Sequence, residues 1–74
     1  GFQHRVGEIT QILDAKTLVL SDRLRVVLPK ADTSMKVGIR LEVRGWLSQS
    51  PASIRMQFPW TLNLKALTNR VRVP

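Results

Sequence analysis

The sequence predicts an all-β domain, a small five-stranded barrel with at most a short helical turn. The first observation is a period of two in the apolar residues, clearest in GIRLEVRGWLS, residues 38–48, which is typical of strands with one buried face. The second is that five such stretches fit into 74 residues, and none has the period of a helix of ordinary length. Because an open sheet would leave two unpaired edges, we expect the strands to close into a barrel.

The first half of the chain supplies three predicted strands. The first covers residues 5–13, RVGEITQIL, in which we expect Gly7 to mark a bulge or a sharp bend, because glycine inside a strand often does so. The second strand is TLVL, residues 17–20, and the third is LRVVL, residues 24–28. The third strand ends before Pro29, because proline lacks the N–H group that a strand interior needs.

The fourth strand follows a longer connection, KADTSMKV, residues 30–37. Asp32 and Ser34 are candidate helix caps, so this connection has room for at most a single helical turn. The fourth strand covers residues 39–47, and its alternation places Trp46 beside Arg44 on the face that points away from the barrel interior. A large indole on a charged face is the first feature that suggests binding.

The C-terminal part contains a loop, a short apolar segment and a last strand. SQSPAS, residues 48–53, has the composition of a loop. The segment from Ile54 to Trp60 alternates, and it is expected to be either a hairpin partner or the start of the last strand's ladder, with an irregularity at Pro59. The fifth strand covers residues 61–73. Its inward-facing set changes phase near residues 66–67, which requires a bulge or a bend.

Composition argues against catalysis. The chain has no cysteine and one histidine, which excludes disulfides, thiolate or multi-histidine metal sites and a cysteine nucleophile. We expect His4 to be a solvated residue near the N-terminus, and Asp14 and Asp22 to bond backbone N–H groups in turns. No glycine-rich phosphate loop is present. The sequence therefore predicts a protein that is not an enzyme and that has no cofactor and no metal.

Length and segment composition predict how the chain is organised. Residues 1–74 are expected to form one domain, a module of a larger protein or assembly. The sequence contains no apolar run of the length that a membrane helix needs and no visible signal peptide. We therefore expect a cytoplasmic protein without a membrane span.

The glycines and the β pattern resemble those of OB-fold domains of the kind that bind single-stranded DNA or tRNA anticodons. The resemblance rests on VGEITQI at residues 6–12, on LVLSD and LRVVL, and on VGIRLEVRGWL at residues 37–47. It implies a five-stranded OB-like β-barrel that serves as a binding scaffold, with the outer face of the second and third strands as the usual platform. The usual helix between the third and fourth strands would be very short or absent.

A second segment is similar to the opening of staphylococcal-nuclease-like barrels. The segment is ILDAKTLVLSDRLRVVLPKADT, residues 12–33, in which Asp14 and Thr17 match that family's pattern. Lys16 stands where a second acidic residue is expected, and a divalent cation needs several oxygen ligands. A chain descended from that family is therefore expected to be catalytically inactive.

Charge favours a polyanionic partner. Twelve lysines and arginines outnumber five acidic residues, the net charge is +7, and no acidic residue follows Glu42. Single-stranded nucleic acid is bound by cations that contact its phosphates and by flat side chains that stack on its bases. We expect these contacts from the following residues: Arg23, Arg25, Arg40, Arg44, Trp46, Trp60 and Lys65.

Two alternatives stay open at this point. Trp46 and Trp60 are each either contact residues or parts of the core, because a small barrel often recruits an indole for stability. The chain as a whole is alternatively a protein-interaction module that docks onto an acidic partner or a neighbouring domain. In that case the segment from Ile54 to Trp60 is the interface.

Overall fold

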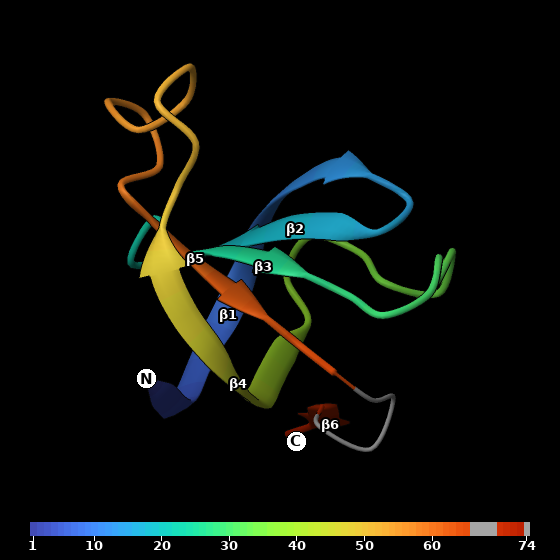
Figure 1. Ribbon diagram of the computed structural model, residues 1–74. Coiled ribbons are helices and arrows are strands. Elements are labelled where there is room, and N and C mark those ends of the chain that lie inside the picture. The colour runs from blue at the N-terminus through green and yellow to red at the C-terminus, as the bar shows by residue number, and fades with distance from the viewer. Residues whose placement is uncertain (66–69, 74) are drawn as a thin grey trace.

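The computed structural model describes residues 1–65 and 70–73, and within them the chain forms strands, turns and loops without a helix (Figure 1). The strands are β1 (Phe2–Asp14), β2 (Thr17–Leu20), β3 (Arg25–Val27), β4 (Arg40–Gln49), β5 (Trp60–Asn63) and β6 (Arg70–Arg72). The predicted all-β class is therefore confirmed.

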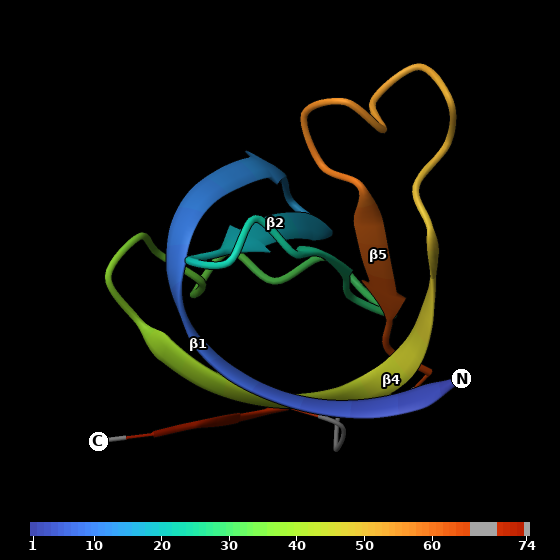
Figure 2. The same cartoon turned by 90° about the vertical axis from the view of Figure 1, so that its left-hand side faces the viewer.

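Five of these strands close into a barrel in the order β1-β2-β3-β5-β4-β1. The neighbours pair antiparallel except β3 and β5, which run parallel with Arg25 opposite Thr61. Figure 2 shows β1 and β4 curving around the interior, and the loop between β4 and β5 projecting away from the barrel. This small closed barrel is compatible with an OB-like fold.

The long strand β1 serves two neighbours. Its first half pairs with β4 from Phe2 to Glu8, and its second half pairs with β2 from Ile9 onward. Of the bulge or sharp bend expected at Gly7, the bulge is absent, because Gly7 keeps regular register with Leu41 and the irregularities fall after Ile9. The glycine instead permits close approach, since a β-carbon there would lie 3.3 Å from the Cβ of Leu20.

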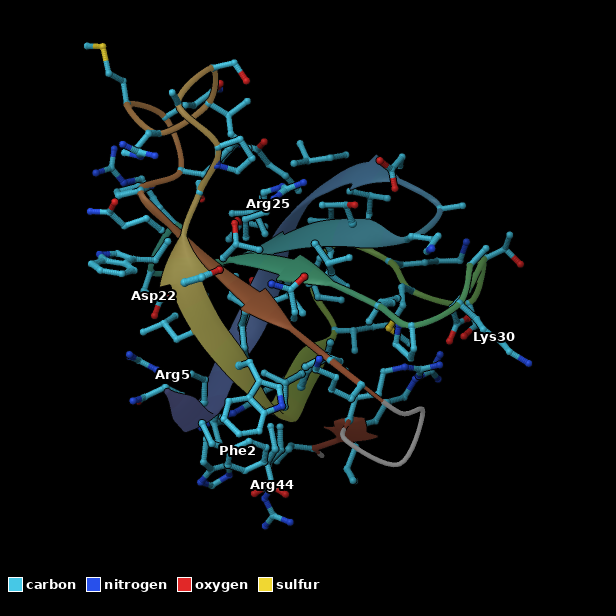
Figure 3. The ribbon with its side chains drawn as sticks, viewed as in Figure 1. Phe2, Arg5, Asp22, Arg25, Lys30 and Arg44 are labelled. Carbon is cyan, nitrogen blue, oxygen red and sulfur yellow. The ribbon has the colours of Figure 1, made fainter. Side chains whose placement is uncertain are left out.

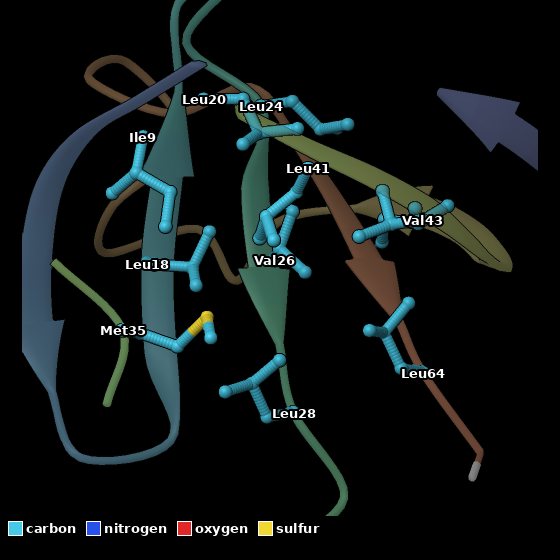
Figure 4. Close-up of a cluster of buried hydrophobic side chains, with 11 residues drawn as sticks. Ile9, Leu18, Leu20, Leu24, Val26, Leu28, Met35, Leu41, Val43 and Leu64 are labelled. Carbon is cyan, nitrogen blue, oxygen red and sulfur yellow. The ribbon is translucent and has the colours of Figure 1, made fainter. Parts of the chain in front are cut away.

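The core follows from the alternation of the strands. Val26 on β3, Leu41 and Val43 on β4 and Leu62 on β5 are at most 1% exposed. Figure 4 shows side chains from the opposing strands meeting inside the barrel. The buried cluster consists of Ile9, Leu18, Leu20, Leu24, Val26, Leu28, Met35, Leu41, Val43, Leu62 and Leu64. On β3 and β4, the residues that alternate with these face away from the core.

The predicted single C-terminal strand is interrupted. β5 pairs with the second half of β4, and β6 pairs with its first half, so both lie along the same edge of β4. The expected phase change at residues 66–67 lies outside the described residues. After β5, the N–H of Leu64 donates to the carbonyl of Val27 at 3.0 Å, which keeps the chain on β3 for one more residue.

The connection between β3 and β4 contains no helical turn, which agrees with the prediction of at most a short one. Asp32 instead closes a side-chain turn: its Oδ1 accepts the N–H of Ser34 at 2.9 Å and the hydroxyl of Ser34 at 2.6 Å. Asp32 also forms an ion pair with Arg70 of β6. The ion pair thereby attaches the connection to β6, which pairs with β4.

The loop between β4 and β5 is neither a hairpin strand nor part of the β5 ladder. Its chain makes tight turns in which the N–H of Phe58 donates to the carbonyl of Ile54 at 2.8 Å. Phe58 is buried, whereas Met56 at the tip is 97% exposed. The loop is therefore anchored by Phe58, and β5 begins only after Pro59.

Candidate nucleic-acid interface

An outward-facing groove lies between β3, β5 and the loop that follows β4. Arg25 and Val27 alternate with buried Val26, and Thr61 and Asn63 alternate with buried Leu62, so these four side chains share the outer face. The groove has a volume of about 470 Å³. Its lining is completed by Ser48, Gln49, Ser50, Pro51 and Arg55. No acidic residue lines it within the described part of the chain.

Two arginines in this groove are held by one buried polar link. Nη1 of Arg25 donates to Oγ1 of Thr61 at 3.0 Å, and Thr61 shares a 2.7 Å hydrogen bond with the hydroxyl of Ser50. Nε of Arg55 donates to the carbonyl of Ser50 at 2.9 Å. Ser50 is fully buried. These hydrogen bonds hold both side chains in place. Each guanidinium group has five N–H donors and uses one of them here, so the others are free to bind an anion.

Trp46 continues this face along β4. It lies two residues before Ser48 and directly opposite Asn63 of β5, both of which line the groove. Its side chain is 48% exposed. Phe2 of β1 packs against it edge to face, with ring centroids 5.3 Å apart and planes at 73°. The indole is thus steadied by the N-terminal strand and keeps an open surface next to the groove.

Arg44, Arg40 and Lys65 lie farther from the groove. Arg44 is exposed on the same face as Trp46, beside His4 of β1, and Figure 3 shows it at the lower end of the barrel. Arg40 begins β4 and lines a different hollow with Arg72. Lys65 follows β5 and is exposed. These residues extend the basic surface but do not converge on the groove.

His4 is exposed near the N-terminus, as expected, but it also makes a contact that the sequence did not indicate. It belongs to β1, and its Nε2 lies 2.9 Å from Oε2 of Glu42 on β4. This contact engages the one acidic side chain that β4 presents on the outer face.

The structure separates Arg23 and Trp60 from the groove. Arg23 precedes β3 and adopts a left-handed conformation with φ 63°, so its side chain does not share the face of Arg25. Both Arg23 and Trp60 line a hollow of about 400 Å³ at one end of the barrel, together with Arg5 and Asp22. We call this hollow the mouth pocket. The expectation that Arg23 and Arg25 form one platform is therefore wrong.

Sequence reasoning missed three residues of these surfaces: Arg5, Arg55 and Phe2. Arg5 shares the inward parity of Gly7 and Ile9, so the alternation itself marked it as an unusual inward arginine. Arg55 was visible only as one more basic residue in a loop. Nothing in the sequence indicates that Phe2 reaches Trp46, because that contact depends on the register between β1 and β4.

Asp14 and Asp22 each accept a backbone N–H in a turn. Oδ1 of Asp14 accepts the N–H of Lys16 at 2.8 Å, and Oδ1 of Asp22 accepts the N–H of Leu24 at 3.2 Å, as the sequence predicted. The bond from Lys16 keeps the pKa of Asp14 below its ordinary value. Among residues 1–65 and 70–73, no cluster of three or more potential ligand side chains is placed to hold a metal ion.

No helix in the described part of the chain is long and apolar enough to cross a membrane. Comparisons with protein-family models, with curated proteins and with solved structures found no significant match to this chain. The residues and their geometry therefore carry the functional argument.

Proposed function

We propose that this chain is a non-catalytic module of the OB type that binds single-stranded nucleic acid along the outer face of β3, β5 and β4. The observation that carries the proposal is the pair Arg25 and Arg55, fixed through Ser50 in a groove that runs on to Trp46. The order of the barrel strands and the parallel pairing of β3 with β5 support the assignment to the OB type.

The two halves of the surface match the two parts of a nucleotide. The guanidinium groups of Arg25 and Arg55 offer paired N–H donors to phosphate oxygens, and binding releases counterions from the strand. The half-exposed indole of Trp46 offers a face on which a base can stack, and such stacking contributes about 1–3 kcal/mol per base. Neither contact reads base identity, so we expect little sequence preference.

A second candidate function is docking onto an acidic protein through the loop between β4 and β5. Met56 favours it, because a methionine that is 97% exposed next to Arg55 suits a partner that is both apolar and acidic. The buried Phe58 reduces the apolar surface that this loop offers. Replacing Met56 by alanine separates the candidates, since it should leave oligonucleotide binding unchanged.

The proposal is tested by titrating a fluorescent single-stranded oligonucleotide at several salt concentrations. Arg25→Gln combined with Arg55→Gln should weaken binding by about tenfold or more at low salt, because each arginine loses a charge-assisted contact. The slope of log affinity against log salt should fall by about 1.4, or 0.7 for each phosphate contact on a single strand.

Lys30→Gln is the control for each single arginine variant, because it removes one positive charge at the right-hand end of the molecule in Figure 3, away from Arg25. We expect it to leave the salt slope of the intact chain nearly unchanged. Arg25→Lys, which keeps the charge, and a melting curve for each variant separate lost contacts from lost folding. Absence of binding to the unmodified protein at low salt, or equal effects of Lys30→Gln and Arg25→Gln, would overturn the proposal.

A further inference from the structure

The mouth pocket is a second, separate concave surface. It lies at the end of the barrel, and its volume of about 400 Å³ falls within the range of pockets that hold small ligands. Figure 3 places Arg5 and Asp22 on one side of the barrel, away from Arg25. None of the residues that line the mouth pocket also lines the groove.

Arg5, which lines the pocket, has one unsatisfied hydrogen-bond donor. Its Nε is buried and has no hydrogen-bond partner within residues 1–65 and 70–73. A buried donor without a partner is rare and costs free energy. A guanidinium group also binds oxyanions through paired N–H groups. An anion in the pocket would therefore meet a side chain that lacks an acceptor.

Arg23 adds a second cation at the same place. The tight turn before β3 holds its backbone at φ 63°, with its N–H donating to the carbonyl of Leu20 at 2.9 Å. The one carboxylate in the lining, Asp22, already accepts the N–H of Leu24. Within the described residues, neither Arg5 nor Arg23 forms an ion pair, so the pocket carries a net positive charge.

Trp60 supplies the apolar part of the pocket. Its side chain is 47% exposed, and Leu24 and Leu47 contribute aliphatic surface to the same lining. An exposed indole beside aliphatic side chains suits a flat ring that stacks on it. The pocket thus combines a stacking surface with two guanidinium groups.

We propose that the mouth pocket binds a nucleotide, with the base stacked on Trp60 and the phosphate held by Arg5 and Arg23. This inference does not rest on the proposed function of the outer face, because it concerns different residues. A free mononucleotide and the phosphorylated end of a strand carry the same chemistry, so either is a source of this ligand.

The test uses the two tryptophans as separate reporters, since the chain has only these two. In a Trp46→Phe variant all indole emission comes from Trp60, and in a Trp60→Phe variant all of it comes from Trp46. Each variant is titrated with AMP, with adenosine and with inorganic phosphate up to millimolar concentrations. We expect saturable quenching by AMP in the Trp46→Phe variant and none in the Trp60→Phe variant, with weaker quenching by adenosine.

Arginine variants in the Trp46→Phe background complete the test. Arg23→Gln should weaken AMP binding by about tenfold through the loss of one charge-assisted contact, while Arg23→Lys should retain part of it. Lys30→Gln serves as the matched control and should leave AMP binding unchanged, because Lys30 lines neither the mouth pocket nor the groove. Because Arg5→Gln alters a half-buried position, it is interpreted only when its melting curve matches that of the parent variant.

The outcomes separate this inference from the proposal for the outer face. Stronger quenching of Trp60 by a short oligonucleotide with a terminal phosphate than by the same oligonucleotide without it would assign the pocket to strand ends, and equal quenching by the two would assign it to free nucleotides. Absence of saturable quenching by AMP, or quenching that Arg23→Gln leaves unchanged, would overturn the inference. Either result leaves the test of Arg25 and Arg55 unaffected.

Discussion

Replacing Gly45 by alanine should destabilise the barrel more than any other glycine-to-alanine change in the chain. A methyl group at Gly45 would lie 2.9 Å from the carbonyl carbon of Asn63 and 2.9 Å from Cδ2 of Leu64, and closer still to the carbonyl oxygen of Asn63. The atoms in the way belong largely to the backbone of β5 and cannot rotate aside. The substitution therefore has to separate β4 from β5 at the point where Asn63 enters the groove.

The size of the effect follows from two opposing contributions. Overpacking of a filled core costs about 1–3 kcal/mol, and the backbone contact at Gly45 places this case at the upper end. Alanine also reduces the conformational entropy of the unfolded chain, which stabilises the folded state by about 0.4–1 kcal/mol. The net loss of about 2–3 kcal/mol is large for a domain of this size, whose total stability should be about 4–11 kcal/mol. It corresponds to a fall in Tm of about 10–20 °C.

The assay is thermal unfolding followed by circular dichroism, with Gly7→Ala as the matched control. At Gly7 the added methyl group would meet the Cβ of Leu20 at 3.3 Å, which a small adjustment of that side chain relieves. We expect Gly7→Ala to lower Tm by only a few degrees. A Gly45→Ala variant that melts at the temperature of the unmodified protein, or above Gly7→Ala, would refute the packing argument.

Two further predictions concern the acidic turn and the N-terminal strand. The hydrogen bonds from Ser34, followed by the charge of Arg70, keep the pKa of Asp32 below its ordinary value. The ionised carboxylate therefore stabilises the fold above the unfolded pKa of about 3.9. This stabilisation is lost as the pH falls through the lower pKa of the folded state. Asp32→Asn should therefore lower the urea midpoint at neutral pH and converge with the unmodified protein in acid, and an equal deficit at both pH values would contradict this. Phe2→Ala removes the edge contact on Trp46, an interaction of about 0.5–1.5 kcal/mol. In a Trp60→Phe background, this change should shift the emission of Trp46 to longer wavelength. An unchanged spectrum would show that Phe2 does not cover the indole.

The strands were predictable because their signal is local. β2 covers the predicted residues, and β4 begins and ends within two residues of its predicted bounds. The alternation of apolar and polar residues that defines such a strand can be read from neighbouring positions in the sequence. The outward position of Trp46 followed from the same parity. The interruption between β5 and β6 was not predictable in this way, because both segments carry strand-forming residues and only their pairing with β4 distinguishes them.

The candidate site was less predictable, because it depends on contacts between distant segments. The link from Arg25 through Thr61 and Ser50 to Arg55 joins residues of β3, β5 and the loop after β4, and no motif in the sequence indicates it. Arg23 and Arg25 are two residues apart, which would put them on the same face of a regular strand. Because Arg23 has a positive φ angle, its side chain lines the mouth pocket instead. Local patterns thus identified the basic and aromatic residues but not how they are grouped.

The parallel pairing of β3 with β5 has a consequence for how the chain reaches its folded state. The barrel closes only when residues 61–63 pair with residues 25–27, and β1 finds β4 across a comparable separation, from Phe2 to Trp46. Contacts so far apart in sequence slow the search for the native arrangement. During synthesis the barrel therefore cannot close before β5 has left the ribosome. Until then β3 and β4 each have an unpaired edge, which can pair with strands of other chains.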